Sequence, residues 1–247
     1  MSETLKHDEE LPKSEHLAEG VRPIMACVGT IKQYGEEIAE IKDIENVGHN
    51  VDYYLHPEDL DERGFKNAGR QSYVISPIDN RPKFTKKLSN CTTLIAVGRE
   101  TGAQTELSFL THQDPHEFLY LKKSLFAEDL KKQLQELKEK CSENSIDIVI
   151  AGGNLRQENP DEYQRSLELL TSVVGETCGF EPLIICGPKQ EYNFDNVYFD
   201  TQKRRAYIVR PEQDVSPSYN DVFRLSEIGK MKEKWKEERR RRLKSEQ

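Results

Sequence analysis

The chain has no apolar run approaching the roughly 20 residues that a membrane-spanning helix needs, so we expect no membrane span. Its first twenty residues, 1–20, hold six acids, two lysines and no apolar core, and so they do not resemble a signal peptide. We therefore expect a cytoplasmic protein, with export by a dedicated secretion route left open. Because this stretch has little to bury, we also expect 1–20 to be a disordered acidic tail.

Cysteine is scarce and scattered, at Cys27, Cys91, Cys141, Cys178 and Cys186. The five residues form no CxxC pair and leave an odd thiol, which indicates reduced cysteines in a cytosol-like compartment. We expect Cys27 to pack in the core, as most free cysteines do. A net charge of −8 argues against a general nucleic-acid-binding surface. No pattern calls for a cofactor, and we expect none.

One cysteine and one histidine stand at corresponding ends of two strand-like runs. Cys91 directly precedes the run 92–97, and His112 lies at the end of the next run, just after its apolar part 107–110. The link 98–104 is polar and has two glycines, which predicts a hairpin. Adjacent antiparallel strands would bring the two side chains together, and a Cys–His pair is the minimum equipment for thiol catalysis. Core packing of Cys91 is the alternative reading.

The motif Leu88-Ser89-Asn90-Cys91-Thr92-Thr93 resembles the Leu-Ser-Gly-Cys signature of the CheD-like protein glutamine deamidases, a superfamily that includes the cytotoxic necrotising factor toxins. The resemblance continues with a histidine at the end of the next strand and a threonine six residues before the cysteine. It implies that Cys91 is the nucleophile, that His112 is the base and that Thr85 orients the imidazole. Asn90 stands where the signature prefers glycine, and asparagine is the next most tolerant of left-handed backbone.

The second half of the chain follows the same resemblance in its order of elements. The patterns predict a strand ending in Gly152-Gly153, a helix over 160–174, a strand over 182–186 and a hairpin of 196–200 with 205–209. The resemblance covers about 70–210 and implies an α/β (α+β) fold, a layered sandwich of mixed, largely antiparallel sheet with flanking helices. We expect one such domain over 21–222, with an N-terminal extension.

His112 and His116 are four residues apart, and Asp114 lies between them in the sequence. Residues of these types can ligate a metal ion. Pro115 lies between the two histidines and is poorly tolerated inside a helix. Asp114 as N-cap, Pro115 at the first helical position and Glu117 at the third instead predict a helix start. We therefore expect no metal. An amphipathic helix over 122–141 should follow and pack on the sheet.

The end of the chain, 223–247, is predicted to be a charged helix or tail. Residues 227–247 carry nine Lys or Arg and five Glu. Such alternating charge supports an exposed helix, and the basic run could contact an acidic partner.

These features predict a cysteine-dependent amidohydrolase acting on glutamine side chains of a protein substrate. The Cys91 thiolate would attack the carboxamide, and Asn90, Thr92 and Gln113 would contribute to oxyanion and substrate contacts. Water would then hydrolyse the thioester, whereas an amine in its place would give transglutamination. Two alternatives remain: a non-catalytic CheD-fold module that binds a protein partner, and a scaffolding or RNA-associated protein that acts through the basic tail.

Overall fold

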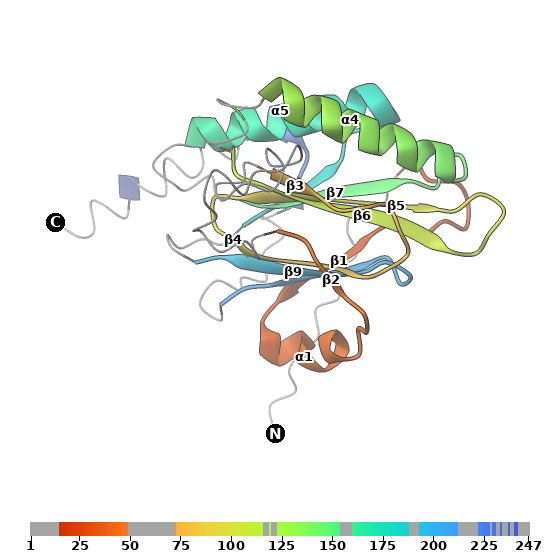
Figure 1. Ribbon diagram of the computed structural model, residues 1–247. Helices are drawn as coiled ribbons and strands as arrows, with labels where there is room; N and C mark the ends of the chain where they lie inside the picture. The colour runs from red at the N-terminus through yellow and green to blue at the C-terminus, as the bar shows by residue number, and fades with distance from the viewer. Residues whose placement is uncertain are drawn as a thin grey trace, which may run out of the picture.

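The protein has four layers in a computed structural model, in the order helix, sheet, sheet, helix (Figure 1). The described residues are 15–48, 73–115, 119, 123–153, 160–187, 193–211, 222–227, 229–230, 233, 237 and 240–241. Two mixed sheets lie face to face (Figure 1). Helices α4 (Lys123–Lys140) and α5 (Pro160–Cys178) cover the upper sheet, and α1 (Ile31–Ala39) lies against the lower one. The predicted fold class, a layered α+β sandwich, is confirmed.

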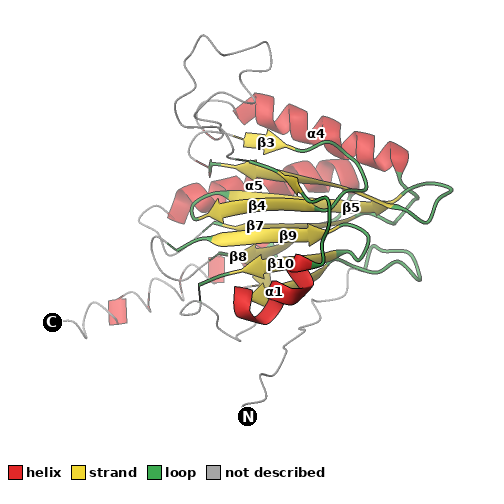
Figure 2. Ribbon diagram, turned by 60° about the horizontal axis from the view of Figure 1, so that its bottom comes forward, coloured by secondary structure: helices red, strands yellow, loops and turns green. Residues whose placement is uncertain are grey.

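The lower sheet has five strands in the order β1-β10-β9-β4-β2. The first two strands of that order pair in parallel, as do the last two, and the remaining pairs are antiparallel. Helix α1 lies over β10 (Figure 2). The elements are β1 (Met25–Gly29), α1 (Ile31–Ala39), β2 (Glu45–Asn46), β4 (Lys83–Leu88), β9 (Asp195–Asp200) and β10 (Arg205–Val209).

The upper sheet has six strands in the order β11-β8-β7-β5-β6-β3. Only β7 and β8 pair in parallel. The strands are β3 (Tyr73–Ile75), β5 (Thr92–Arg99), β6 (Glu106–Gln113), β7 (Asp147–Gly152), β8 (Leu183–Cys186) and β11 (Val222–Phe223). The covering helices are α4 (Lys123–Lys140) and α5 (Pro160–Cys178), and a short 3-10 helix, η4 (Leu225–Glu227), follows the last strand.

Both faces of the upper sheet are buried, and strand alternation decides which face each side chain meets. In β5, Leu94 and Ala96 join the cluster under α4 and α5. Their neighbours Ile95 and Val97 join a second cluster between the two sheets. Such double burial explains the almost continuous apolar sequence of this strand. The odd-numbered residues of β5, such as Ile95 and Val97, therefore face the lower sheet.

The sequence pattern does not reveal α1. The apolar stretch 24–31 has the composition of a single buried strand, but β1 ends at Gly29 and the helix begins at Ile31. The side-chain Oε1 of Gln33 accepts a hydrogen bond from the Thr30 backbone N–H at 2.8 Å. This is one half of a capping box, which starts a helix at that point.

The expected tails are described only in part. Residues 1–14 and 49–72 lie outside the described residues. Further along the predicted N-terminal tail, the His16 ring stacks on Phe180 with 3.6 Å between ring centroids, and the Ala18 N–H donates to Asn144 O. In the predicted C-terminal segment, the described positions 229–230, 233, 237 and 240–241 have helical backbone.

A candidate Cys–His site between the two sheets

The pairing of β5 with β6 determines how the nucleophile and base candidates face each other. Thr92 lies opposite Gln113 in this antiparallel ladder, and the same register continued by one residue sets Cys91 opposite Asp114. His112 is then the diagonal neighbour of Cys91 on the same face, and diagonal neighbours lie about 7–8 Å apart along a sheet. By strand alternation this face is the one toward the lower sheet. The predicted hairpin is confirmed. Its second strand, β6, is longer than the apolar run 107–110 and includes His112.

The imidazole of His112 is held from the opposite sheet. Thr85 on β4 brings its Oγ1 to 2.7 Å from His112 Nδ1. Both side chains are buried, with 3% of His112 and none of Thr85 exposed. The contact joins the residues that the family resemblance paired as base and orienting group.

This contact can select the tautomer of the ring. When Nδ1 carries the proton, it donates to Thr85 Oγ1, and the Nε2 lone pair is then the one that can accept a thiol proton. A hydroxyl can also donate to Nδ1, which would leave the proton on Nε2 and make the ring unable to act as a base there. The orienting group is therefore weaker than a carboxylate, which accepts only.

Gly48 forms the wall on the Thr85 side of the ring, a role that the sequence did not indicate. It lies two residues after the end of β2, and the N–H of the intervening Val47 donates to Phe84 O. Its φ is +96°, and a Cβ at this position would lie 2.8 Å from His112 Nδ1. Only glycine fits both the backbone conformation and the space.

The backbone of Cys91 is held by the turn that ends β7. The Gly153 N–H donates to Cys91 O at 2.9 Å. Gly152 and Gly153 have φ of +88° and +69°, and a Cβ on Gly152 would lie 2.8 Å from Cys91 O. The Gly-Gly turn therefore allows a close approach between this turn and the nucleophile strand. The side chain of Cys91 is half-buried and packs against the apolar cluster between the sheets.

Burial raises the pKa of the Cys91 thiol well above its ordinary value, and the negative charge of Asp114 raises it further. A hydrogen bond from the residue's own backbone opposes these effects but is smaller. The thiol is thus protonated at neutral pH. Catalysis by this pair would need His112 to take the proton as the thiol attacks, rather than a thiolate formed beforehand.

The three residues assigned to oxyanion and substrate contacts lie on different sides of the strand. Asn90 is exposed in the turn before Cys91, and the left-handed residue near it is Lys87, with φ of 61°, at the irregular end of β4. Thr92 and Gln113 are fully buried, and Gln113 Nε2 donates to Thr92 Oγ1 at 2.9 Å. By alternation this pair faces α4 and α5, away from the Cys91 side chain. Their assigned roles stay predictions.

The other four thiols pack in different apolar clusters from Cys91. Cys27 is buried beside Tyr34 and Tyr207, as expected for a core cysteine. Burial raises the pKa of Cys141 to about 12 and that of Cys178 to about 11, and Cys186 is buried. Such thiols are unreactive at neutral pH.

The described part of the chain has no group of three or more His, Cys, Asp or Glu side chains arranged to hold a metal ion. His116, the second histidine of the metal reading, lies outside the described residues, whereas Pro115 has helical backbone directly after Asp114. Within the same residues, no helix is both long and apolar enough to cross a bilayer.

No protein-family model matches this chain, and no curated protein matches it.

Proposed function

We propose that the protein is a cysteine-dependent amidohydrolase that converts glutamine side chains of a protein substrate to glutamate. The observation that carries the proposal is the 2.7 Å contact between Thr85 Oγ1 and His112 Nδ1, on the face of the sheet that also bears Cys91. An oriented imidazole beside a thiol is suited to amide cleavage. The resemblance of 88–93 to the CheD-like signature supports glutamine as the amide.

The proposed reaction has two halves. Cys91 Sγ attacks the carboxamide carbon while His112 takes the thiol proton, so that a C–S bond forms and the carbonyl oxygen gains negative charge. Backbone N–H groups near Asn90 and Cys91 would stabilise this oxyanion, usually the largest single contribution in acyl transfer. The C–N bond then breaks, and His112 gives its proton to the departing ammonia, which leaves a thioester.

In the second half, water attacks the thioester and gives a proton to His112. The C–S bond breaks, the proton returns to Sγ, and glutamate is released. An amine that reaches the thioester before water would instead form a new amide, which is transglutamination.

The test uses synthetic peptides that each contain one internal glutamine. Wild-type protein should release ammonia and replace the amide NH2 by OH, which mass spectrometry detects, and added hydroxylamine should trap the thioester as a hydroxamate. Cys91→Ala and His112→Ala should be inactive, while the matched control Cys178→Ser should keep its activity, because this thiol lies at the end of α5. Activity that survives in Cys91→Ala, or a wild type inactive on every peptide, would refute the proposal.

The second candidate is a non-catalytic module that binds a protein partner. The raised pKa of Cys91 favours it, because a thiol that is hard to ionise is typical of a structural cysteine. A peptide with a chloromethyl ketone in place of the glutamine carboxamide separates the two. Modification of Cys91 that depends on His112 supports the enzyme, and an unmodified Cys91 supports the binding module.

A further inference from the structure

A fully buried ion pair lies at the end of the two sheets where the candidate site is. Arg210 follows β10, Asp195 opens β9, and neither side chain is exposed. Arg210 Nε donates to Asp195 Oδ1 at 3.0 Å and Nη2 donates to Oδ2 at 3.3 Å. Burying two charges removes them from water, and their mutual attraction repays this desolvation only partly. Stability alone therefore does not account well for this pair.

Arg210 also reaches the upper sheet and connects to the backbone of Cys91. Its Nη2 donates to the carbonyl oxygen of Cys186 at the end of β8. The next residue, Gly187, donates its N–H to Gly153 O at 2.9 Å, and Gly153 in turn donates to Cys91 O at 2.9 Å. A short chain of hydrogen bonds thus runs from the guanidinium to the nucleophile.

Asp195 approaches the same segment from the other side. It pairs with Leu88 in the ladder between β9 and β4, three residues before Cys91. The side chain of Leu88 also packs against the Gly152 turn, where an added Cβ would lie 3.1 Å from Leu88 Cβ. The ion pair is therefore linked to Cys91 from two sides: Asp195 pairs with Leu88 in the segment that leads into Cys91, and Arg210 reaches the turn that holds the Cys91 carbonyl through Cys186 and Gly187.

We propose that Arg210 is a positioning residue for the reaction proposed above: held by Asp195, it fixes the backbone of Cys186, Gly187 and Gly153 and so the position of Cys91. The inference rests on the proposed function. Gly153 and Gly187 have no side chains with which to anchor this turn, and the space for any is filled. A Cβ on Gly187 would lie 2.3 Å from Gly153 O. The turn is therefore held by hydrogen bonds from its neighbours: the Tyr163 hydroxyl donates to Gly152 O at 2.8 Å, and Arg210 fixes the Cys186 carbonyl next to Gly187.

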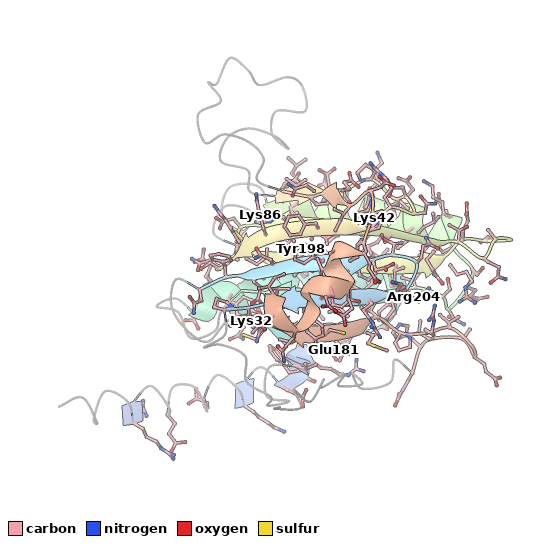
Figure 3. All side chains as sticks on the ribbon, turned by 90° about the horizontal axis from the view of Figure 1, so that it is seen from below. Lys32, Lys42, Lys86, Glu181, Tyr198 and Arg204 are labelled. Carbon is pink, nitrogen blue, oxygen red and sulfur yellow. The ribbon has the colours of Figure 1, made fainter. Side chains whose placement is uncertain are left out.

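The chain contains a matched control at the other end of the same strand. Arg204 precedes β10, is fully buried and pairs with Glu106 at 2.7 Å. It also donates to backbone carbonyls, at 2.7 Å to Ser145 O and at 2.9 Å to Arg22 O. Arg204 thus bridges the two sheets with the same chemistry as Arg210. It lies toward the end of the lower sheet opposite to Lys86, a β4 residue close to the candidate site (Figure 3).

The experiment compares Arg210→Lys with Arg204→Lys in the full chain. Lysine keeps the positive charge. A single ammonium group, however, lacks the planar array of N–H donors with which arginine hydrogen-bonds to a carboxylate and a carbonyl at the same time. We expect Arg210→Lys to lose about a hundredfold in kcat on a glutamine peptide, the loss typical of a small misplacement of reacting groups, with KM nearly unchanged. Arg204→Lys should keep kcat within about threefold per folded molecule. Equal losses in the two variants would overturn the proposal.

Amide hydrogen exchange gives a readout that does not depend on activity. The Gly153 N–H should exchange faster in Arg210→Lys and as slowly as in wild type in Arg204→Lys, and equal exchange in both variants would overturn the role of Arg210. An inactive wild type would refute the proposed function alone, since the exchange of Gly153 still decides the inference. If Arg210→Lys does not fold, Gly187→Ala interrupts the same chain while keeping both charges. It should lower kcat in the same way, and an unchanged kcat would overturn the proposal.

Discussion

Replacing Thr85 by valine removes the hydroxyl that holds the candidate base and keeps nearly the same side-chain shape. Thr85 Oγ1 lies 2.7 Å from His112 Nδ1, and both side chains are buried. Valine would leave the ring nitrogen without this partner, and an unsatisfied buried polar group costs about 1–3 kcal/mol. We expect the free energy of unfolding to fall by about that amount, measured by urea denaturation.

The loss of activity should exceed what this loss of stability explains. Where a carboxylate orients a catalytic histidine, removal of its charge lowers kcat about 10⁴-fold, chiefly through the wrong tautomer. A neutral hydroxyl makes a hydrogen bond about half as strong as a charged partner. We therefore expect Thr85→Val to lose about 10- to 100-fold in kcat for ammonia release, with little change in KM.

Thr85→Ser is the matched control because it keeps the oxygen and removes only a methyl group. It should keep kcat within about threefold of wild type. A Thr85→Val protein that is folded and as active as wild type would refute the assignment of Thr85 as the orienting residue. So would a Thr85→Ser protein that loses as much activity as the valine variant.

Three further outcomes follow from the described contacts. Gly48→Ala would bring a Cβ to 2.8 Å from His112 Nδ1 at a φ of +96°, and we expect at least about a tenfold loss of kcat, with folding checked by circular dichroism. Because burial, and after it Asp114, raise the pKa of Cys91, its alkylation by iodoacetamide should be slow at neutral pH and faster in alkali. Asp114→Asn should lower that pKa and speed the alkylation, which peptide mapping would follow. Burial alone would raise the pKa of Asp79, but hydrogen bonds from a lysine and an arginine hold it below its ordinary 3.8. The resulting stability is present above that pH and is lost as pH falls through the lowered value. Urea titrations should show this acid loss in wild type and less of it in Asp79→Asn.

The residues on the nucleophile hairpin could be anticipated because strand alternation is a local property. Two apolar runs joined by a polar, glycine-containing link predict the pairing of β5 with β6, and that pairing sets Cys91 and His112 on the same face of the sheet. The same period of two places Thr92 and Gln113 on the opposite face. A substrate contact by either side chain would have to be made from that face, toward α4 and α5.

Gly48 and Arg210 could not be anticipated, because their roles depend on contacts between sheets. Nothing near Gly48 in the sequence indicates that an imidazole packs on it, since His112 comes from a distant strand of the other sheet. Arg210 is likewise one of many arginines until the ends of β8, β9 and β10 are brought together. The missed helix α1 is different in kind: its first residue, Ile31, continues an apolar run, and only the capping contact of Gln33 ends the strand pattern.

The candidate site is divided between the two sheets, and this division ties its chemistry to their packing. Cys91 and His112 belong to the upper sheet, while Thr85 and Gly48 confine the ring from the lower one. A shift of one sheet relative to the other would therefore move the imidazole against the thiol without breaking any strand pairing. The Arg204–Glu106 pair and the hydrogen bond from Arg210 to the Cys186 carbonyl cross between the sheets at opposite ends of β10, so both resist such a shift. Only Arg210 also continues into the turn that holds Cys91, which is why its loss should affect catalysis more than stability.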